Sequence, residues 1–211
     1  MAKYSGLKSS LQTSTDGTPV WHHPGGKLVE LGSHALKQDE LLAILIGSGV
    51  SGRPALSIAN AILDQYVGLH GIHRQATIED IARIPGLGRR KAERILAAIE
   101  LGRRLHALNR SSTVAPATAG DLFSSVRDDP GSQASDNAAG DAQLLAKVIG
   151  SGVRGRSSLV IAKALLARFG SFRGLYGRDM GDFLSIKGLN SVKIIRITAA
   201  LEIAKRLANA I

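Results

Sequence analysis

The segment from Ile46 to Arg53 reads IGSGVSGR, and the segment from Ile149 to Arg156 reads IGSGVRGR. The similarity extends beyond these octets, because 15 of 26 residues are identical between segments 41–66 and 144–169. After a deletion of one residue, further identities follow as far as Leu105. Self-similarity of this kind indicates a repeated structural unit, here of about 70 residues. We therefore predict that the chain contains an internal duplication.

The apolar residues within each copy recur with helical spacing. Aromatic residues make up only 4% of the chain, which favours packed helices over sheets. We predict helices over 54–66, 78–84, 90–108, 159–169, 180–186 and 192–208. The fold class is therefore all-α, with two tandem compact helical domains, each built on paired helical hairpins.

The domain boundaries follow from composition. The stretches RSSTVAPATAG and DDPGS are rich in small and polar residues and in proline, as is typical of linkers. The predicted organisation is a flexible N-terminal arm (1–25), a first domain (26–109), a linker (110–140) in which GDLFSSV favours a short helix, and a second domain (141–211).

The charge of the chain favours an anionic partner. The formal net charge is +10, and the second domain has a larger positive balance than the first. The chain has no cysteine, which excludes disulfides and thiolate metal sites and is typical of cytoplasmic proteins. It also has no apolar run of roughly 18 residues, so we expect no membrane span. We expect DNA as the partner, a cytoplasmic and nucleoid-associated location, and neither a cofactor nor a bound metal.

The stretch IARIPGLGRRKAERI, residues 81–95, carries the sharpest chemical signal. The pair Gly86 and Gly88 permits positive φ angles in a tight turn, and Leu87 between them can enter the core. The first amides of the following helix lack partners and form an anion site. Three cations stand at that same helix end, where they oppose the helix dipole but suit a phosphate: Arg89, Arg90 and Lys91.

This stretch resembles the helix-hairpin-helix motif, which binds the DNA backbone. The pattern is filled by Ile81, Ile84, Pro85, Gly86, Leu87, Gly88 and Ala92. The second copy, IKGLNSVK at 186–193, is weaker: Lys187 stands in place of proline, and Asn190 replaces the second glycine. We expect a left-handed conformation at Asn190, which asparagine tolerates better than most residues.

The two octets then supply the other hairpin of each domain. Two hairpins per domain would contact the two strands of a duplex, with little sequence preference. The residues predicted to bind DNA are Gly47, Ser48, Gly49, Gly52, Arg53, Gly86, Leu87, Gly88, Arg89, Arg90, Lys91, Gly150, Ser151, Gly152, Arg154, Gly155, Arg156, Gly188, Leu189, Asn190, Ser191 and Lys193.

A wider resemblance covers roughly residues 26–108. The segment GKLVELGSHALKQDELLAILIGSGVSGRPALSIANAIL, together with IPGLGRRKAERI, resembles the N-terminal region of RadC-type proteins, a bacterial family labelled as DNA repair. Family members continue into a metalloprotease-like domain marked by a His-x-His site. No histidine follows His106 in this chain, so we expect no peptidase activity.

The leading hypothesis is a non-enzymatic, sequence-nonspecific protein that binds duplex or branched DNA in repair or recombination. The first alternative is a lyase or nuclease that uses Lys91 or Lys193 as its nucleophile. Related glycosylases have a catalytic lysine at the position of Arg90, and arginine is a poor nucleophile, which disfavours that alternative. The second alternative is a helical module for protein–protein assembly.

Overall fold

The computed structural model describes residues 11–13, 19–21, 23–112 and 130–210. Within these ranges the chain is helical except for one small antiparallel hairpin of strands β1 (Leu11–Thr13) and β2 (Pro19–Trp21), together with the loops between helices. This confirms the all-α fold class. The hairpin lies in the predicted N-terminal arm, where the sequence pattern predicts no strand. No helix in the described ranges is long and apolar enough to cross a membrane.

The helices fall into two groups along the chain. The first unit contains α1 (Pro24–Leu31), the 3-10 turn η1 (Ser33–Ala35), α2 (Gln38–Ile46), α3 (Ala55–Tyr66), α4 (Leu69–Gln75), α5 (Ile78–Ala82) and α6 (Arg89–Ser112). The second unit contains α7 (Pro130–Ile149), α8 (Ser158–Phe169), η2 (Arg173–Leu175), α9 (Met180–Phe183) and α10 (Ser191–Ala210). All six helices predicted from apolar spacing are present, as α3, α5, α6, α8, α9 and α10.

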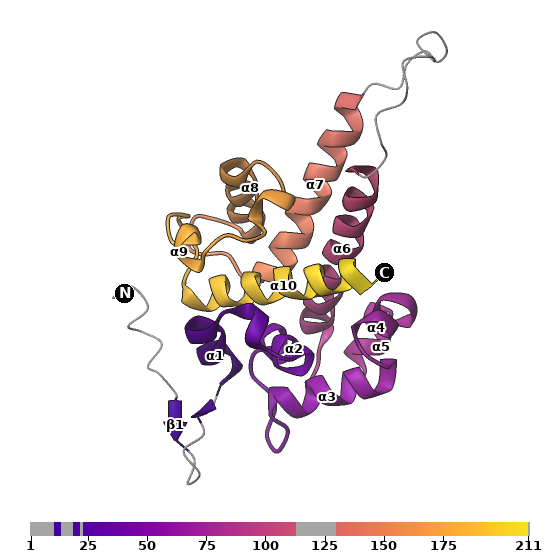
Figure 1. Ribbon diagram of the computed structural model, residues 1–211, viewed down its shortest axis with the longest axis vertical. Coiled ribbons are helices and arrows are strands. Elements are labelled where there is room, and N and C mark those ends of the chain that lie inside the picture. Colours follow the sequence, from indigo (N-terminus) through magenta and orange to yellow (C-terminus); the bar gives the residue numbers. More distant parts are fainter. Residues whose placement is uncertain (1–10, 14–18, 22, 113–129, 211) are drawn as a thin grey trace.

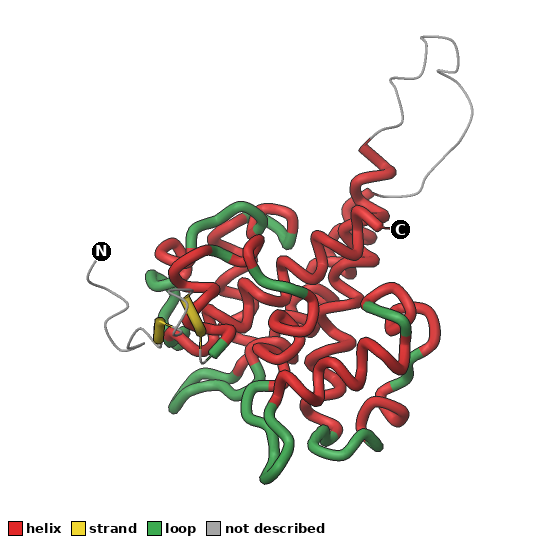
Figure 2. Tube along the Cα trace, turned by 60° about the horizontal axis from the view of Figure 1, so that its bottom comes forward, coloured by secondary structure: helices red, strands yellow, loops and turns green. Residues whose placement is uncertain are grey.

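The segment between the units is more helical than its composition predicts. Helix α6 continues to Ser112, and α7 already begins at Pro130, so both enter the predicted linker at 110–140. The two helices lie side by side (Figures 1 and 2). The short helix predicted within GDLFSSV falls outside the described residues.

The two units share one hydrophobic core. Helix α10 crosses the middle of the molecule, with α1 to α5 on one side and α7 to α9 on the other (Figure 1). It packs against α6 and α2 of the first unit, and the buried apolar residues of both units form one continuous cluster. Eleven of its twenty residues are buried, as is usual for a helix surrounded by other elements. Two separate tandem domains are therefore not confirmed.

The long helices α6 and α10 approach each other closely at Gly102. A Cβ atom at this position would lie 3.0 Å from the carbonyl oxygen of Ala204 and 3.0 Å from Cδ2 of Leu207. A glycine accommodates this close approach of the two helix backbones, whereas a side chain would force its neighbours apart. Gly102 and Ala204 are 102 positions apart, which is the offset that relates the second run of sequence identities. Equivalent positions of the two units thus meet at the crossing.

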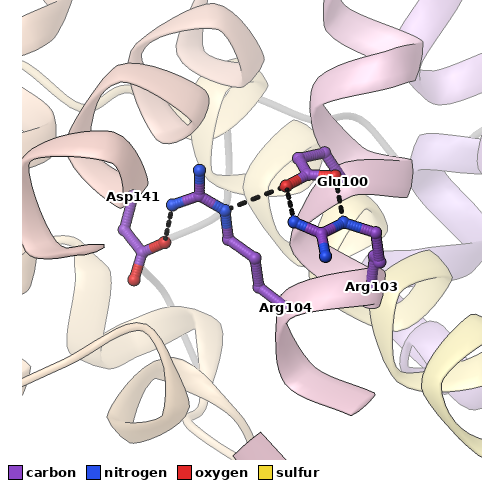
Figure 3. Close-up of polar contacts among 4 residues, drawn as sticks. All are labelled: Glu100, Arg103, Arg104 and Asp141. Atoms are coloured by element: carbon purple, nitrogen blue, oxygen red, sulfur yellow. Dashed lines mark hydrogen bonds and ion pairs between the residues drawn. The ribbon is translucent and has the colours of Figure 1, made fainter. Parts of the chain in front are cut away.

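A chain of ion pairs ties α6 to the second unit (Figure 3). Glu100 receives hydrogen bonds from Arg103 and Arg104, and Arg104 Nη1 also donates to Asp141 Oδ1 of α7 at 2.8 Å. Burial acts to raise the pKa of Glu100, but the hydrogen bonds from the two arginines outweigh it and lower that pKa. Glu100 therefore stays ionised between them.

Helix α10 makes the matching tie to the first unit. Arg206 Nε donates to Glu202 Oε1 at 2.8 Å, and Arg206 Nη2 donates to the carbonyl oxygen of His34 at 3.2 Å. Glu202 and Arg206 correspond to Glu100 and Arg104 at the offset of 102. Each long helix is thus bound to the other unit through its C-terminal half.

We predict that Gly102→Val destabilises the whole chain. The branched side chain has no space against Ala204, and overpacking of this kind costs about 2 kcal/mol. Urea unfolding followed by circular dichroism measures the loss. Gly181→Val in α9 is the matched control, because a Cβ there has no neighbour within 4 Å. Equal losses in the two variants would contradict the close crossing.

Candidate nucleic-acid interface

Each repeated octet folds into a tight turn that leads into the next helix. Val50 and Arg53 exchange two backbone hydrogen bonds of 2.9 Å, as do Val153 and Arg156 in the second unit. The chain folds back on itself so closely that a Cβ at Gly49 would lie 2.1 Å from the carbonyl oxygen of Arg53. Its counterpart in the second unit has the same constraint, with a distance of 2.2 Å to the Arg156 oxygen. This turn geometry explains why the glycine pattern occurs twice.

The second hairpin of each unit packs directly on this turn. In the first unit it joins α5 to α6, and Gly86 adopts φ +95°. A Cβ at Gly86 would lie 3.2 Å from Val50 Cγ2 of the octet turn, and one at Gly188 would lie 3.4 Å from Val153 Cγ2. Leu87 is buried as predicted, and Leu189 packs half-buried against the same core. The two hairpins of a unit therefore form one packed edge.

The left-handed backbone expected at Asn190 is wrong, and Gly88 does not adopt the positive φ angle that a glycine permits. Gly188 and Gly86 have positive φ, whereas neither Gly88 nor Asn190 is among the described residues that do. Both residues instead precede the first residue of a long helix, at the N-cap. The carbonyl oxygen of Gly88 accepts from Lys91 N at 2.9 Å. Asparagine at the corresponding position of the second unit is favoured for its side chain and not for a left-handed backbone.

The two helix starts consequently differ. Asn190 Oδ1 accepts a hydrogen bond of 3.0 Å from Lys193 N, so a side chain satisfies one of the first amides of α10. Gly88 offers no side chain, and the space where a Cβ would stand has no atom within 4 Å. The N-terminus of α6 is therefore the more accessible of the two for an anion.

Lys193 is buried and Lys91 is half-buried, and both ammonium groups bind backbone carbonyl oxygens of their own unit. Lys91 Nζ donates to the carbonyl oxygens of Ser48 and Gly86, at 2.7 and 3.0 Å. Lys193 is 6% exposed, and its Nζ donates to the carbonyl oxygens of Gly152 and Gly188 at 3.3 and 3.0 Å. Each ammonium group thus joins the two hairpins of its own unit. This position differs from the outward, phosphate-facing one that the sequence pattern predicts.

Two arginines make a second tie between the hairpins. Arg53 Nη1 donates to the carbonyl oxygen of Pro85 at 3.3 Å, and Arg156 Nη1 donates to that of Lys187 at 3.2 Å. Both arginines come from the octet turns and reach the turn before a long helix. The hairpins of each unit are therefore held together by one lysine and one arginine.

The 22 predicted site residues divide by their exposure. Ten are exposed: Gly47, Ser48, Gly52, Gly88, Arg89, Arg90, Ser151, Arg154, Gly155 and Asn190. Ten are half-buried: Gly49, Arg53, Gly86, Lys91, Gly150, Gly152, Arg156, Gly188, Leu189 and Ser191. Leu87 and Lys193 are buried.

The exposed cations at the start of α6 are differently engaged. Arg89 pairs with Glu93 Oε1 at 3.2 Å and with Glu79 Oε1 at 3.7 Å, and such exposed pairs are weak. Arg90 is exposed beside it. Sequence reasoning missed two further arginines, Arg94 and Arg196, which lie half-buried one turn deeper along α6 and α10. The sequence does contain a signal that could have located them, because Arg94 and Arg196 are identical residues at equivalent positions of the two copies, 102 residues apart.

These features define an all-α protein with paired, glycine-rich turns between its helices and a basic N-terminus on α6. The UPF0758 N-terminal family matches residues 17–93 and 133–195, about two thirds of the chain. The chain therefore belongs to this family, which agrees with the resemblance to the N-terminal region of RadC-type proteins. One matched segment lies mainly in each unit.

Similar proteins carry the family label without a stated activity. The UPF0758 protein of Alkaliphilus oremlandii is 39% identical over 93 residues, which are 44% of this chain and 40% of that protein. The UPF0758 protein YsxA of Bacillus subtilis is 39% identical over 90 residues, 43% of this chain and 38% of that protein. The chain thus spans about two fifths of the length of these relatives. No solved structure matches it significantly.

We predict that Lys193→Met lowers the free energy of unfolding by about 2 kcal/mol, because two half-buried carbonyl oxygens lose a charged donor. Urea denaturation provides the measurement. Lys205→Met, an exposed position on the same helix, is the control with the same change of charge and should cost less than about 0.5 kcal/mol. An outward-facing Lys193 would make the two losses equal.

Proposed function

We propose that this protein binds DNA without sequence preference, by holding phosphates at its hairpins and at the basic start of its helix α6. The observation that carries the proposal is the open N-terminus of α6 at Gly88, where no atom lies within 4 Å of the Cβ position. Backbone amides and a positive dipole end favour an anion at such a site.

The charges around this site support a phosphate as the anion. Arg89 and Arg90 are exposed in the first turn of α6, and that turn contains no acidic residue. Cations at a helix N-terminus are unfavourable by themselves, because they face the positive end of the dipole. A bound phosphate removes this conflict, since it attracts both the amides and the guanidinium groups.

The matched contacts of the two units support the duplication that the sequence predicts. Both units have the same paired turn, the same lysine tie and the same arginine tie. We propose that the second unit is a copy of the first, with four hairpins in all. Contacts to phosphates from such hairpins position the protein on DNA without reading its sequence.

The inward position of the lysines disfavours a lyase or nuclease. The Nζ groups of Lys91 and Lys193 already donate to two carbonyl oxygens each, so neither is free to attack a substrate. We therefore propose a non-catalytic role, located with the nucleoid in the cytoplasm. Repair or recombination is the process that the RadC-type resemblance suggests.

We predict steeply salt-dependent binding to duplex DNA. If four hairpins neutralise one or two phosphates each, the slope of log affinity against log salt is about −4 to −7. Fluorescence anisotropy with labelled duplex, single-stranded and four-way-junction DNA between low and moderate salt measures it. A protein that bound none of these at low salt would instead favour the alternative of an assembly module.

We predict that Gly88→Asp separates DNA binding from stability. An aspartate at the N-cap stabilises α6 by up to about 1 kcal/mol, because its carboxylate accepts from the first amides. The same carboxylate repels phosphate, so the affinity for duplex DNA should fall about tenfold. Anisotropy and urea unfolding are measured on the same variant. Unchanged affinity would show that DNA does not contact the start of α6.

A further inference from the structure

A cavity of about 630 Å³ lies where the start of α6 faces the second unit. Its charged lining is Arg90, Glu93 and Arg94 of α6, Lys147 of α7 and Arg196 of α10. Four cations and one carboxylate give it a formal charge of +3. Its volume lies within the range of about 300–1,000 Å³ that is common for ligand sites.

The two half-buried arginines converge at one point of this cavity. Arg94 Nη1 donates to the carbonyl oxygen of Leu45 at 2.7 Å, and Arg196 Nη1 donates to that of Ile149 at 3.0 Å. A Cβ built on Gly150 would lie 3.0 Å from Arg94 Nη2 and 3.4 Å from Arg196 Nη1. Both guanidinium groups therefore approach the same backbone turn, from different units.

Each of these arginines also has one buried donor without a hydrogen-bond partner among the described residues. The Nε atoms of Arg94 and Arg196 are buried and have no hydrogen-bond acceptor among the described residues. Burial, together with the charge of Arg196, lowers the pKa of Arg94 to about 10. Two like charges held this close in a half-buried place favour an anion between them.

A second cavity shows that this charge is not imposed by the fold. It also measures about 630 Å³ and lies where α10 faces the first unit. At the offsets that relate the units, Val192 stands for Arg90, Ile195 for Glu93 and Ile44 for Lys147. Of the four cations that line the charged cavity, only Arg94 has a charged counterpart in the second cavity, and that counterpart is Arg196. The same architecture therefore has one charged cavity and one mainly apolar cavity.

We infer that the charged cavity binds a phosphate monoester, supplied by the 5′-phosphate at the end of a DNA strand. A continuous backbone offers singly charged phosphodiesters along a surface, whereas a strand end can enter a cavity and carries up to two charges. Guanidinium groups bind such a group through paired hydrogen bonds. The choice of a strand end as the source rests on the proposed function, because Arg90 belongs to both sites.

The test compares one labelled duplex with either a 5′-phosphate or a 5′-hydroxyl, by fluorescence anisotropy with the full chain. The phosphorylated duplex should bind about tenfold more tightly, the effect of one charge-assisted hydrogen bond of ordinary strength. Isothermal titration with inorganic phosphate and with a nucleoside 5′-monophosphate shows whether the cavity also takes the free group.

Two variants locate the effect in the cavity. Ser158→Asp places a carboxylate on its wall, in the first turn of α8, where an acidic residue stabilises the helix. Arg94→Gln removes one convergent charge. Both variants should bring the ratio of the two affinities to about one. Arg103→Gln on α6 removes the same charge far from the cavity lining and should leave the ratio unchanged.

The outcomes separate this inference from the proposed function. Equal affinity of the wild-type chain for the two duplexes, or a preference that survives Ser158→Asp, overturns the cavity site and leaves DNA binding intact. Binding of free phosphate without binding of either duplex overturns the strand end as the source, together with the proposed function. A preference for the 5′-phosphate that both variants abolish establishes the site.

Discussion

The close crossing of α6 and α10 at Gly102 is the constraint on which the rest of the structure depends. It places a helix of each unit against the other unit, so that the apolar residues of both join in one cluster. The ties from Arg104 to Asp141 and from Arg206 to His34 reinforce this exchange. Neither unit has a complete core without the other, because α10 is buried between them. The stability of the hairpins is therefore a property of the whole chain.

Much of the fold follows from the sequence. Apolar spacing located α3, α6, α8 and α10 closely, because each has one face that must be buried. The shared core did not follow from it, since periodicity identifies the face of a helix that is buried but not the partner that covers it. Gly102 carries that information, and a glycine within a helix does not by itself predict a crossing.

The candidate site, too, could be predicted from the sequence only in part. The glycine pattern correctly located the turns, because a backbone approach as close as that of Gly49 to Arg53 allows no other residue. The orientation of the cations could not be obtained this way. Lys193 and Arg89 both stand at helix starts, yet one is buried against two carbonyl oxygens and the other is exposed. Their roles depend on hairpins that are distant in the sequence.

The crossing also has a mechanical consequence. Thirteen residue steps separate Gly102 from the start of α6 at Arg89, and thirteen separate Ala204 from the start of α10 at Ser191. At 1.5 Å per residue, each helix therefore extends about 20 Å from the crossing to its N-terminus. A change of about 6° in the crossing angle would therefore displace the N-terminus of one helix by about 2 Å relative to the other. The small residues Gly102 and Ala204 at the crossing thus influence the spacing between two helix N-termini that lie about 20 Å away.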